Sequence, residues 1–302
     1  MLKLFLDTSF TGKDLLRTVL RSGNFGDSAF GGGGYVGLDA LEVAFEEDSG
    51  ANSVGVNRLF YQFPVGSNFT ATVGGRVRQD DMLAVWPSAY PTDTVLDFFT
   101  YAGAPGAYNL ALGAGAGVYW QTEGGFSVST SYLSANGNLS DPNTGGMGTD
   151  GAAFSATTQI AYAPESWGIA AAYTKASGTN EVGLYDGNGT RGAVALSLSD
   201  GQTNSYGLSA WWTPEESGWI PSISTGWGLT DISDSDARYV NSATTQSWYV
   251  GLEWSDVFLE GNSFGMAVGQ PTFITDIDVK GGKNESDYLK GGGYAWEFFY
   301  KF

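Results

Sequence analysis

Hydrophobic and polar residues alternate one by one along most of the chain. Phe126, Val128, Thr130 and Tyr132 share one face of their segment, and three serines occupy the other. This period of two is typical of β-strands, because successive side chains of a strand point to opposite faces. The pattern recurs in residues 110–120, 154–162, 206–212, 223–229, 248–254 and 296–302. About fourteen such segments of roughly 8–11 residues, separated by turns rich in Gly, Asn, Asp and Ser, predict an all-β antiparallel fold.

The two faces of these strands differ in composition. One face is apolar and often ends in an aromatic residue, whereas the other carries Gly, Ser, Thr, Gln or a charge. In a soluble β-sandwich the apolar face forms the core and the polar face meets water. In a transmembrane barrel the apolar face meets lipid and the small polar face lines a hydrated lumen. The periodicity is compatible with both arrangements.

Strand length and aromatic placement favour the membrane. Several segments reach the ~9–11 residues with which a tilted strand crosses a bilayer. Aromatic pairs such as Trp211–Trp212 and Trp248–Tyr249 stand near strand ends, where interfacial belts form. The chain also closes on an alternating strand that ends in Phe302. We therefore expect a transmembrane antiparallel β-barrel, with a soluble, aromatic-rich β-sandwich that binds glycans as the alternative.

Composition excludes several classes of protein. The chain has 302 residues, a net charge of −18, and neither Cys nor His. Without these residues there is no thiolate or imidazole metal site and no Ser-His or Cys-His catalytic pair. An acidic chain would repel nucleic acid, so no nucleic-acid partner is expected. No cofactor or metal is expected either. Nothing Pro-rich or charge-blocked divides the chain, which indicates one domain over residues 1–302.

Basic residues gather in the first quarter of the chain. Seven of the 14 precede position 79: Lys3, Lys13, Arg17, Arg21, Arg58, Arg76 and Arg78. A charge that faces lipid at mid-depth costs roughly 2–4 kcal/mol, so we expect the basic side chains that the alternation places on a polar face to point into the lumen. These are Lys13, Arg17, Arg21, Arg76 and Arg78. Residues 79–108 then form the longest connection, and this connection carries carboxylates. Connections longer than ~15 residues in a compact fold are usually functional.

This distribution predicts a charged eyelet, in which a loop folds into the pore and faces a basic wall. The alternative is that the charges merely pair on a wet wall or lie on outer loops. The candidate constriction residues are Arg76, Arg78, Asp80, Asp81, Asp93 and Asp97. The candidate basic cluster of the lumen wall is Lys13, Arg17, Arg21 and Arg58.

Three stretches resemble hallmarks of a known family. They are residues 7–18 (DTSFTGKDLLRT), 75–90 (GRVRQDDMLAVWPSAY) and 97–117 (DFFTYAGAPGAYNLALGAGAG). They are similar to the cyanobacterial outer-membrane porins of the carbohydrate-selective (OprB-type) or iron uptake porin family. The resemblance implies a barrel of about sixteen strands, often trimeric, that passes sugars, inorganic ions and iron passively across the outer membrane. It also implies that Arg76, Arg78, Asp80 and Asp81 belong to the constriction loop.

The chain departs from that family at its ends. No S-layer homology domain is expected in this sequence, which begins at what resembles the second barrel strand. We therefore expect a porin domain that is shortened at one or both ends. An enzyme is not expected, since the nearest carboxylate cluster, Glu253, Asp256 and Glu260, falls on a wet strand and turn. Dependence on detergent would separate a porin from a soluble glycosidase or lectin.

Overall fold

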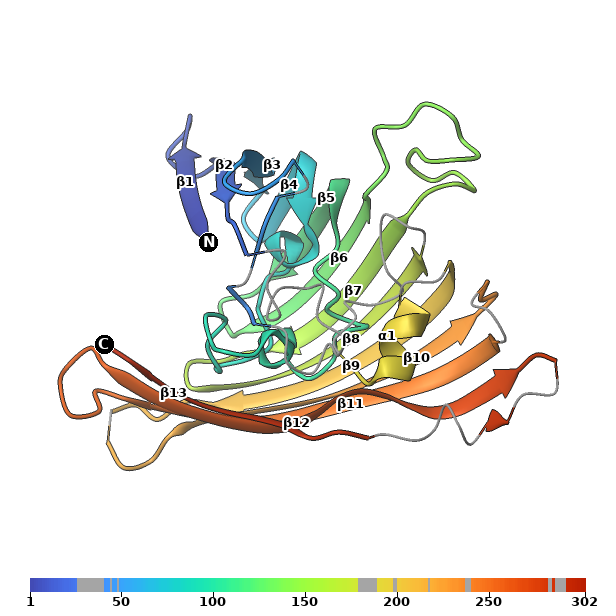
Figure 1. The fold of residues 1–302 in the computed structure, drawn as a ribbon. Helices are drawn as coiled ribbons and strands as arrows, with labels where there is room; N and C mark the ends of the chain where they lie inside the picture. Colours follow the sequence, from blue (N-terminus) through green and yellow to red (C-terminus); the bar gives the residue numbers. More distant parts are fainter. Residues whose placement is uncertain are drawn as a thin grey trace.

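The computed structural model describes residues 1–25, 41–43, 45–47, 49–178, 189–197, 200–216, 218–236, 240–281, 284–285 and 292–302. These residues form one antiparallel sheet of 13 strands, and each strand pairs with its neighbours in the sequence (Figure 1). The all-β antiparallel fold is thus confirmed, with 13 strands in the described residues against the fourteen expected. No helix within those residues is both long and apolar enough to cross a membrane.

The strands differ in length, from seven residues in the first and the last to 17 in the twelfth. The first six are β1 (Leu2–Thr8), β2 (Leu15–Ser22), β3 (Val54–Val65), β4 (Phe69–Arg78), β5 (Leu112–Gln121) and β6 (Phe126–Ser134). The others are β7 (Phe154–Tyr162), β8 (Trp167–Gly178), β9 (Gly201–Trp212), β10 (Ser222–Ser233), β11 (Val240–Ser255), β12 (Ser263–Val279) and β13 (Ala295–Lys301). Two short 3-10 helices, η2 (Gln79–Met82) and η3 (Asp97–Tyr101), lie between β4 and β5.

The sheet curls around a concave inner face (Figure 1). Strands β1 to β4 stand above β11 to β13 in this view, and both chain ends lie on the same side of the molecule. Within the described ranges, no backbone pairing joins β1 to β13. An unpaired strand edge in hydrocarbon leaves backbone groups without hydrogen-bond partners, which is costly.

The apolar face of the sheet points outward. Ile160, Ile169 and Leu208 are 51%, 52% and 54% exposed, although all three lie within regular strands. Ser127 and Ser129 on the opposite face are buried. A soluble sandwich requires the reverse arrangement, with the apolar face packed in a core. The observed arrangement therefore contradicts the sandwich alternative and agrees with a barrel whose outer surface meets lipid.

Residues 79–111, which we call the inward loop, fold onto the concave face of the sheet (Figure 1). Small residues of the strands receive this loop. A Cβ atom at Gly226 would lie 1.8 Å from the carbonyl oxygen of Ala102, and one at Gly251 would lie 2.5 Å from the Tyr90 ring. Neither position has room for a side chain. The loop therefore packs directly on the glycine residues of the inner face.

A second segment also lies on the inner face. Helix α1 (Arg191–Ser197) packs Ala193 and Leu196 against Ile232, Ile274 and Ile277 of β10 and β12. The Thr190 hydroxyl accepts a hydrogen bond from the Ala193 N–H at 3.4 Å, as an N-terminal cap does. Residues 179–188, which precede this segment in the chain, lie outside the described part.

Candidate channel constriction

A cavity of about 860 Å³ separates the inward loop from the wall formed by the first strands. Its basic lining residues come from β1 to β4, and its acidic ones come mainly from the inward loop. The basic residues are Lys3, Arg21, Arg58 and Arg78. The acidic residues are Glu42, Asp80, Asp93 and Asp97. Charges of opposite sign on opposite sides of a narrow aqueous space set up a transverse field that filters solutes by size and charge.

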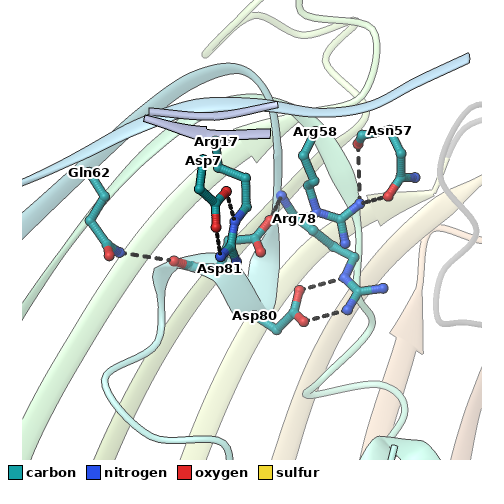
Figure 2. Close-up of polar contacts among 8 residues, drawn as sticks. All are labelled: Asp7, Arg17, Asn57, Arg58, Gln62, Arg78, Asp80 and Asp81. Carbon is teal, nitrogen blue, oxygen red and sulfur yellow. Dashed lines mark hydrogen bonds and ion pairs between the residues drawn. The ribbon is translucent and has the colours of Figure 1, made fainter. Parts of the chain in front are cut away.

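Arg58 joins the strand wall to the loop. Its side chain points to the inner face of β3, where the residue is 6% exposed. The Arg58 Nε–H donates to Asp81 Oδ2 at 2.6 Å, and Nη1 donates to the backbone oxygen of Asn57 at 3.1 Å (Figure 2). The same Asp81 oxygen accepts the backbone N–H of Arg78 at 2.9 Å. One carboxylate thus fixes both the start of the loop and the adjacent strand.

Arg78 and Asp80 form a second pair, in which the guanidinium donates to both carboxylate oxygens (Figure 2). Burial alone would raise the pKa of Asp80, but the charge and hydrogen bonds of Arg78 outweigh it, so this pKa lies below its ordinary value. Burial, and then the nearby charge of Asp80, raise the pKa of Asp81. Such bidentate pairs hold a guanidinium in a fixed orientation.

The acidic residues of the loop are fixed by contacts with β13, with the loop itself and with residues 41–43. Asp93 accepts a hydrogen bond from Lys301 Nζ of β13 at 2.5 Å. Asp97 accepts the Tyr101 hydroxyl at 3.3 Å. The short segment 41–43 lies against the loop, with Leu41 bridged to Leu96 and the Glu42 N–H donating to Val95 at 3.1 Å.

Glu42 is an acidic residue of the cavity with a strongly raised pKa. Burial, followed by its hydrogen bond to Asp97, raises the pKa of Glu42 to about 9. The positive charges of Lys3 and Arg78 lower the pKa of Glu42, but by less than burial and Asp97 raise it. At neutral pH the Glu42 carboxyl is therefore protonated, and it is hydrogen-bonded to Asp97.

The structure brings seven of the ten candidate residues to the cavity or its ion pairs. Arg21, Arg58, Arg78, Asp80, Asp93 and Asp97 line the cavity, and Asp81 pairs with Arg58. Arg21 also pairs with Glu47 at 3.0 Å and lies 3.3 Å from the centroid of the Phe45 ring.

The other three candidates lie elsewhere. Arg76 is exposed and does not line the cavity, because a register shift between Gly74 and Val77 interrupts the alternation that would place it with Thr72 on the inner face. Arg17 pairs with Asp7 of β1, with an Nη2–Oδ2 distance of 2.7 Å (Figure 2). Lys13 lies in the exposed turn between β1 and β2.

Four contributors were missed by sequence reasoning: Lys3, Glu42, Trp86 and Glu297. Lys3 and Asp7 alternate with Leu4 and Leu6 in β1, so the period-two pattern could have placed Lys3 on the polar face. The same applies to Glu297, which alternates with Trp296 and Phe298. Glu42 and Trp86 lie outside the strands, where no periodic signal exists.

Comparison with known sequences identifies relatives in cyanobacteria. No family model matches the chain. An uncharacterized protein of Synechocystis sp. is 28% identical over 315 residues, which covers 98% of this chain and 55% of that protein. An uncharacterized protein of Nostoc sp. is 27% identical over 330 residues, covering 97% of this chain and 53% of that protein. The chain thus spans about half the length of the curated relatives it matches.

Comparison with solved structures identifies the fold as that of outer-membrane porins. An anion-selective porin from Comamonas acidovorans superposes with a TM-score of 0.52 and 11% identity, over 99% of this chain and 86% of that one. Pseudomonas putida OprB superposes with a TM-score of 0.51 and 10% identity, over 90% of this chain and 68% of that one. A loop-deletion mutant of OmpT, an outer membrane protein of Vibrio cholerae, superposes with a TM-score of 0.50 and 9% identity, over 90% of this chain and 73% of that one.

Proposed function

We propose that this chain forms a passive outer-membrane channel for small hydrophilic solutes. The observation that carries the proposal is the orientation of the sheet: its apolar face is exposed outward, while a charged cavity lies inside. This is the distribution that a barrel in lipid with a hydrated interior needs. Membrane lipid is then the partner of the outer face, and solutes in transit are the partners of the inner one.

The cavity between the inward loop and β1 to β4 is the proposed constriction. Its loop side consists of Asp80, Asp81, Asp93 and Asp97, together with Arg78 at the end of β4. Its wall contains Arg21 and Arg58. Arg76, Arg17 and Lys13 are assigned to the approaches rather than to the narrowest part, because they do not line the cavity. The chain performs no covalent chemistry in this account.

The solute classes and the assembly follow the family resemblance. The motifs in residues 7–18, 75–90 and 97–117 support membership of the OprB-type or iron uptake porin family, and the relatives in cyanobacteria agree with that source. Inorganic ions, iron and sugars are the proposed solutes. A homotrimer is the proposed assembly.

Swelling of proteoliposomes tests this function. The folded protein is reconstituted into vesicles that contain an impermeant polymer, and the vesicles are diluted into iso-osmotic solutions of a monosaccharide, a salt or a long oligosaccharide. We expect swelling in the first two solutions and none in the third. A protein that is folded and inserted but lets none of these solutes enter would contradict the proposal.

A further inference from the structure

Strand β13 presents one carboxylate to the inside of the sheet. Glu297 alternates with the outward-facing Trp296 and Phe298, which are 68% and 52% exposed, and is itself 4% exposed. A carboxylate that is removed from water in this way must be compensated by hydrogen bonds or by an opposite charge. Within the described part of the chain, no lysine or arginine forms an ion pair with Glu297.

The compensation comes from the inward loop. The Tyr90 hydroxyl donates to Glu297 Oε1 at 2.7 Å. The backbone N–H groups of Leu96 and Val95 donate to Oε2 at 2.7 Å and 3.1 Å. Both carboxylate oxygens are therefore used, and every donor belongs to the loop rather than to the sheet.

The residues around Glu297 hold the same part of the loop. The Tyr90 ring packs edge-on against Phe299 of β13, with 6.0 Å between centroids. Lys301, four residues after Glu297 on the same face of the strand, binds Asp93. Residues 90–97 are thus attached to β13, and these residues carry Asp93 and Asp97, which form the acidic side of the cavity.

We propose that Glu297 is a positioning residue of the channel, which holds the acidic side of the constriction against β13. The inference rests on the proposed function above. Glu297 does not line the cavity, so it acts through the loop and not by direct contact with a solute. Without its carboxylate, the loop loses the hydrogen bonds that Tyr90, Val95 and Leu96 make to β13. The loop is then held less rigidly on β13, and its acidic groups no longer face the basic wall at a fixed distance.

The test compares Glu297→Ala with Glu297→Gln in planar bilayers. A glutamine can accept the two backbone N–H groups through its oxygen and donate its amide to the Tyr90 oxygen, so it preserves the attachment while removing the charge. We expect Glu297→Ala to raise open-channel noise and shift the reversal potential in a salt gradient towards anions. Glu297→Gln should stay close to the native protein. Equal shifts in both variants would overturn the proposal, since the charge itself would then be acting.

A tether provides the rescue. Because the chain has no native cysteine, Asp93→Cys and Lys301→Cys can be joined by a short bifunctional thiol reagent without side reactions. In the Glu297→Ala background, this tether should lower the noise to the level of the tethered protein that retains Glu297. Persistent noise after complete cross-linking would overturn the positioning role. If the native protein gave no channels at all, the proposed function would fail instead, which is a distinguishable result.

Discussion

Arg58 Nε lies 2.6 Å from Asp81 Oδ2, and this ion pair connects the strand wall to the first turn of the inward loop. Arg58 is 23 residues from Asp81 in sequence, yet the two groups are nearly buried together. Their charges therefore act on the cavity as a pair. Removing one of them leaves the other uncompensated.

Neutral substitutions of this pair should have opposite effects on selectivity. We expect Arg58→Gln to shift the reversal potential towards cations and Asp81→Asn to shift it towards anions, because each leaves a single charge beside the cavity. The double variant should return near the native value. Each single variant should also lose about 1.5–3 kcal/mol of stability. A double-mutant cycle on bilayer currents and on urea unfolding measures both quantities.

Lys175→Gln is the matched control for this cycle. Lys175 is an exposed residue near the end of β8, and it also carries one positive charge. Its removal should leave the reversal potential unchanged. A shift as large as that of Arg58→Gln would mean that overall charge, rather than the pair, sets selectivity.

Arg76 and Arg78 should differ although only one residue separates them. Arg78 lines the cavity and binds Asp80, whereas Arg76 is exposed and lies within the register shift in β4. We expect Arg78→Ala to produce the larger change in reversal potential and conductance. Single-channel recordings of the two variants in the same salt gradient give the comparison. Equal effects would place both arginines in the constriction.

A side chain at Gly226 should displace the inward loop. The Cβ of Gly226→Ala would meet the Ala102 carbonyl oxygen, and overpacking of this kind costs about 1–3 kcal/mol. We expect lower resistance to urea and a changed conductance. Gly75→Ala is the control, because a Cβ at Gly75 has no atom within 4 Å. Equal stability of the two variants would argue that the loop does not lie on β10.

Selectivity should also depend on pH through Glu42. Its pKa of about 9 means that the carboxyl is neutral below that pH and gains a negative charge above it. The charged groups that act on it are Asp97, Lys3 and Arg78. We expect preference for cations to increase as pH rises through about 9. Reversal potentials measured about one unit below and above that pH test this, and the shift should be smaller in Glu42→Gln.

The β-fold and its faces were predictable because strand alternation is a local property. Ser127, Ser129 and Phe126 lie on the faces that their parity assigns. Parity fails where the ladder is irregular, and Arg76 shows this: the register shift between Gly74 and Val77 is set by pairing with β5, which the local sequence does not encode.

The parts of the site that could not be predicted depend on contacts distant in sequence. Glu42 reaches Asp97 only because segment 41–43 pairs with residues 95–96. Glu297 meets Tyr90 across more than 200 residues of chain. The position of such a partner follows from how the whole sheet curls, so the carboxylate can be assigned to a face from sequence but not to its partner.

A porin requires water inside the sheet and lipid outside it. Cysteine substitution in planar bilayers tests this requirement directly, since the chain has no native cysteine. Asp93, whose side chain is 68% exposed, lines the cavity, and Leu208 lies on the outer face. A bulky water-soluble thiol reagent should reduce the current through Asp93→Cys channels stepwise and leave Leu208→Cys channels unchanged. Absence of channel currents, or a block in Leu208→Cys with none in Asp93→Cys, would contradict the account.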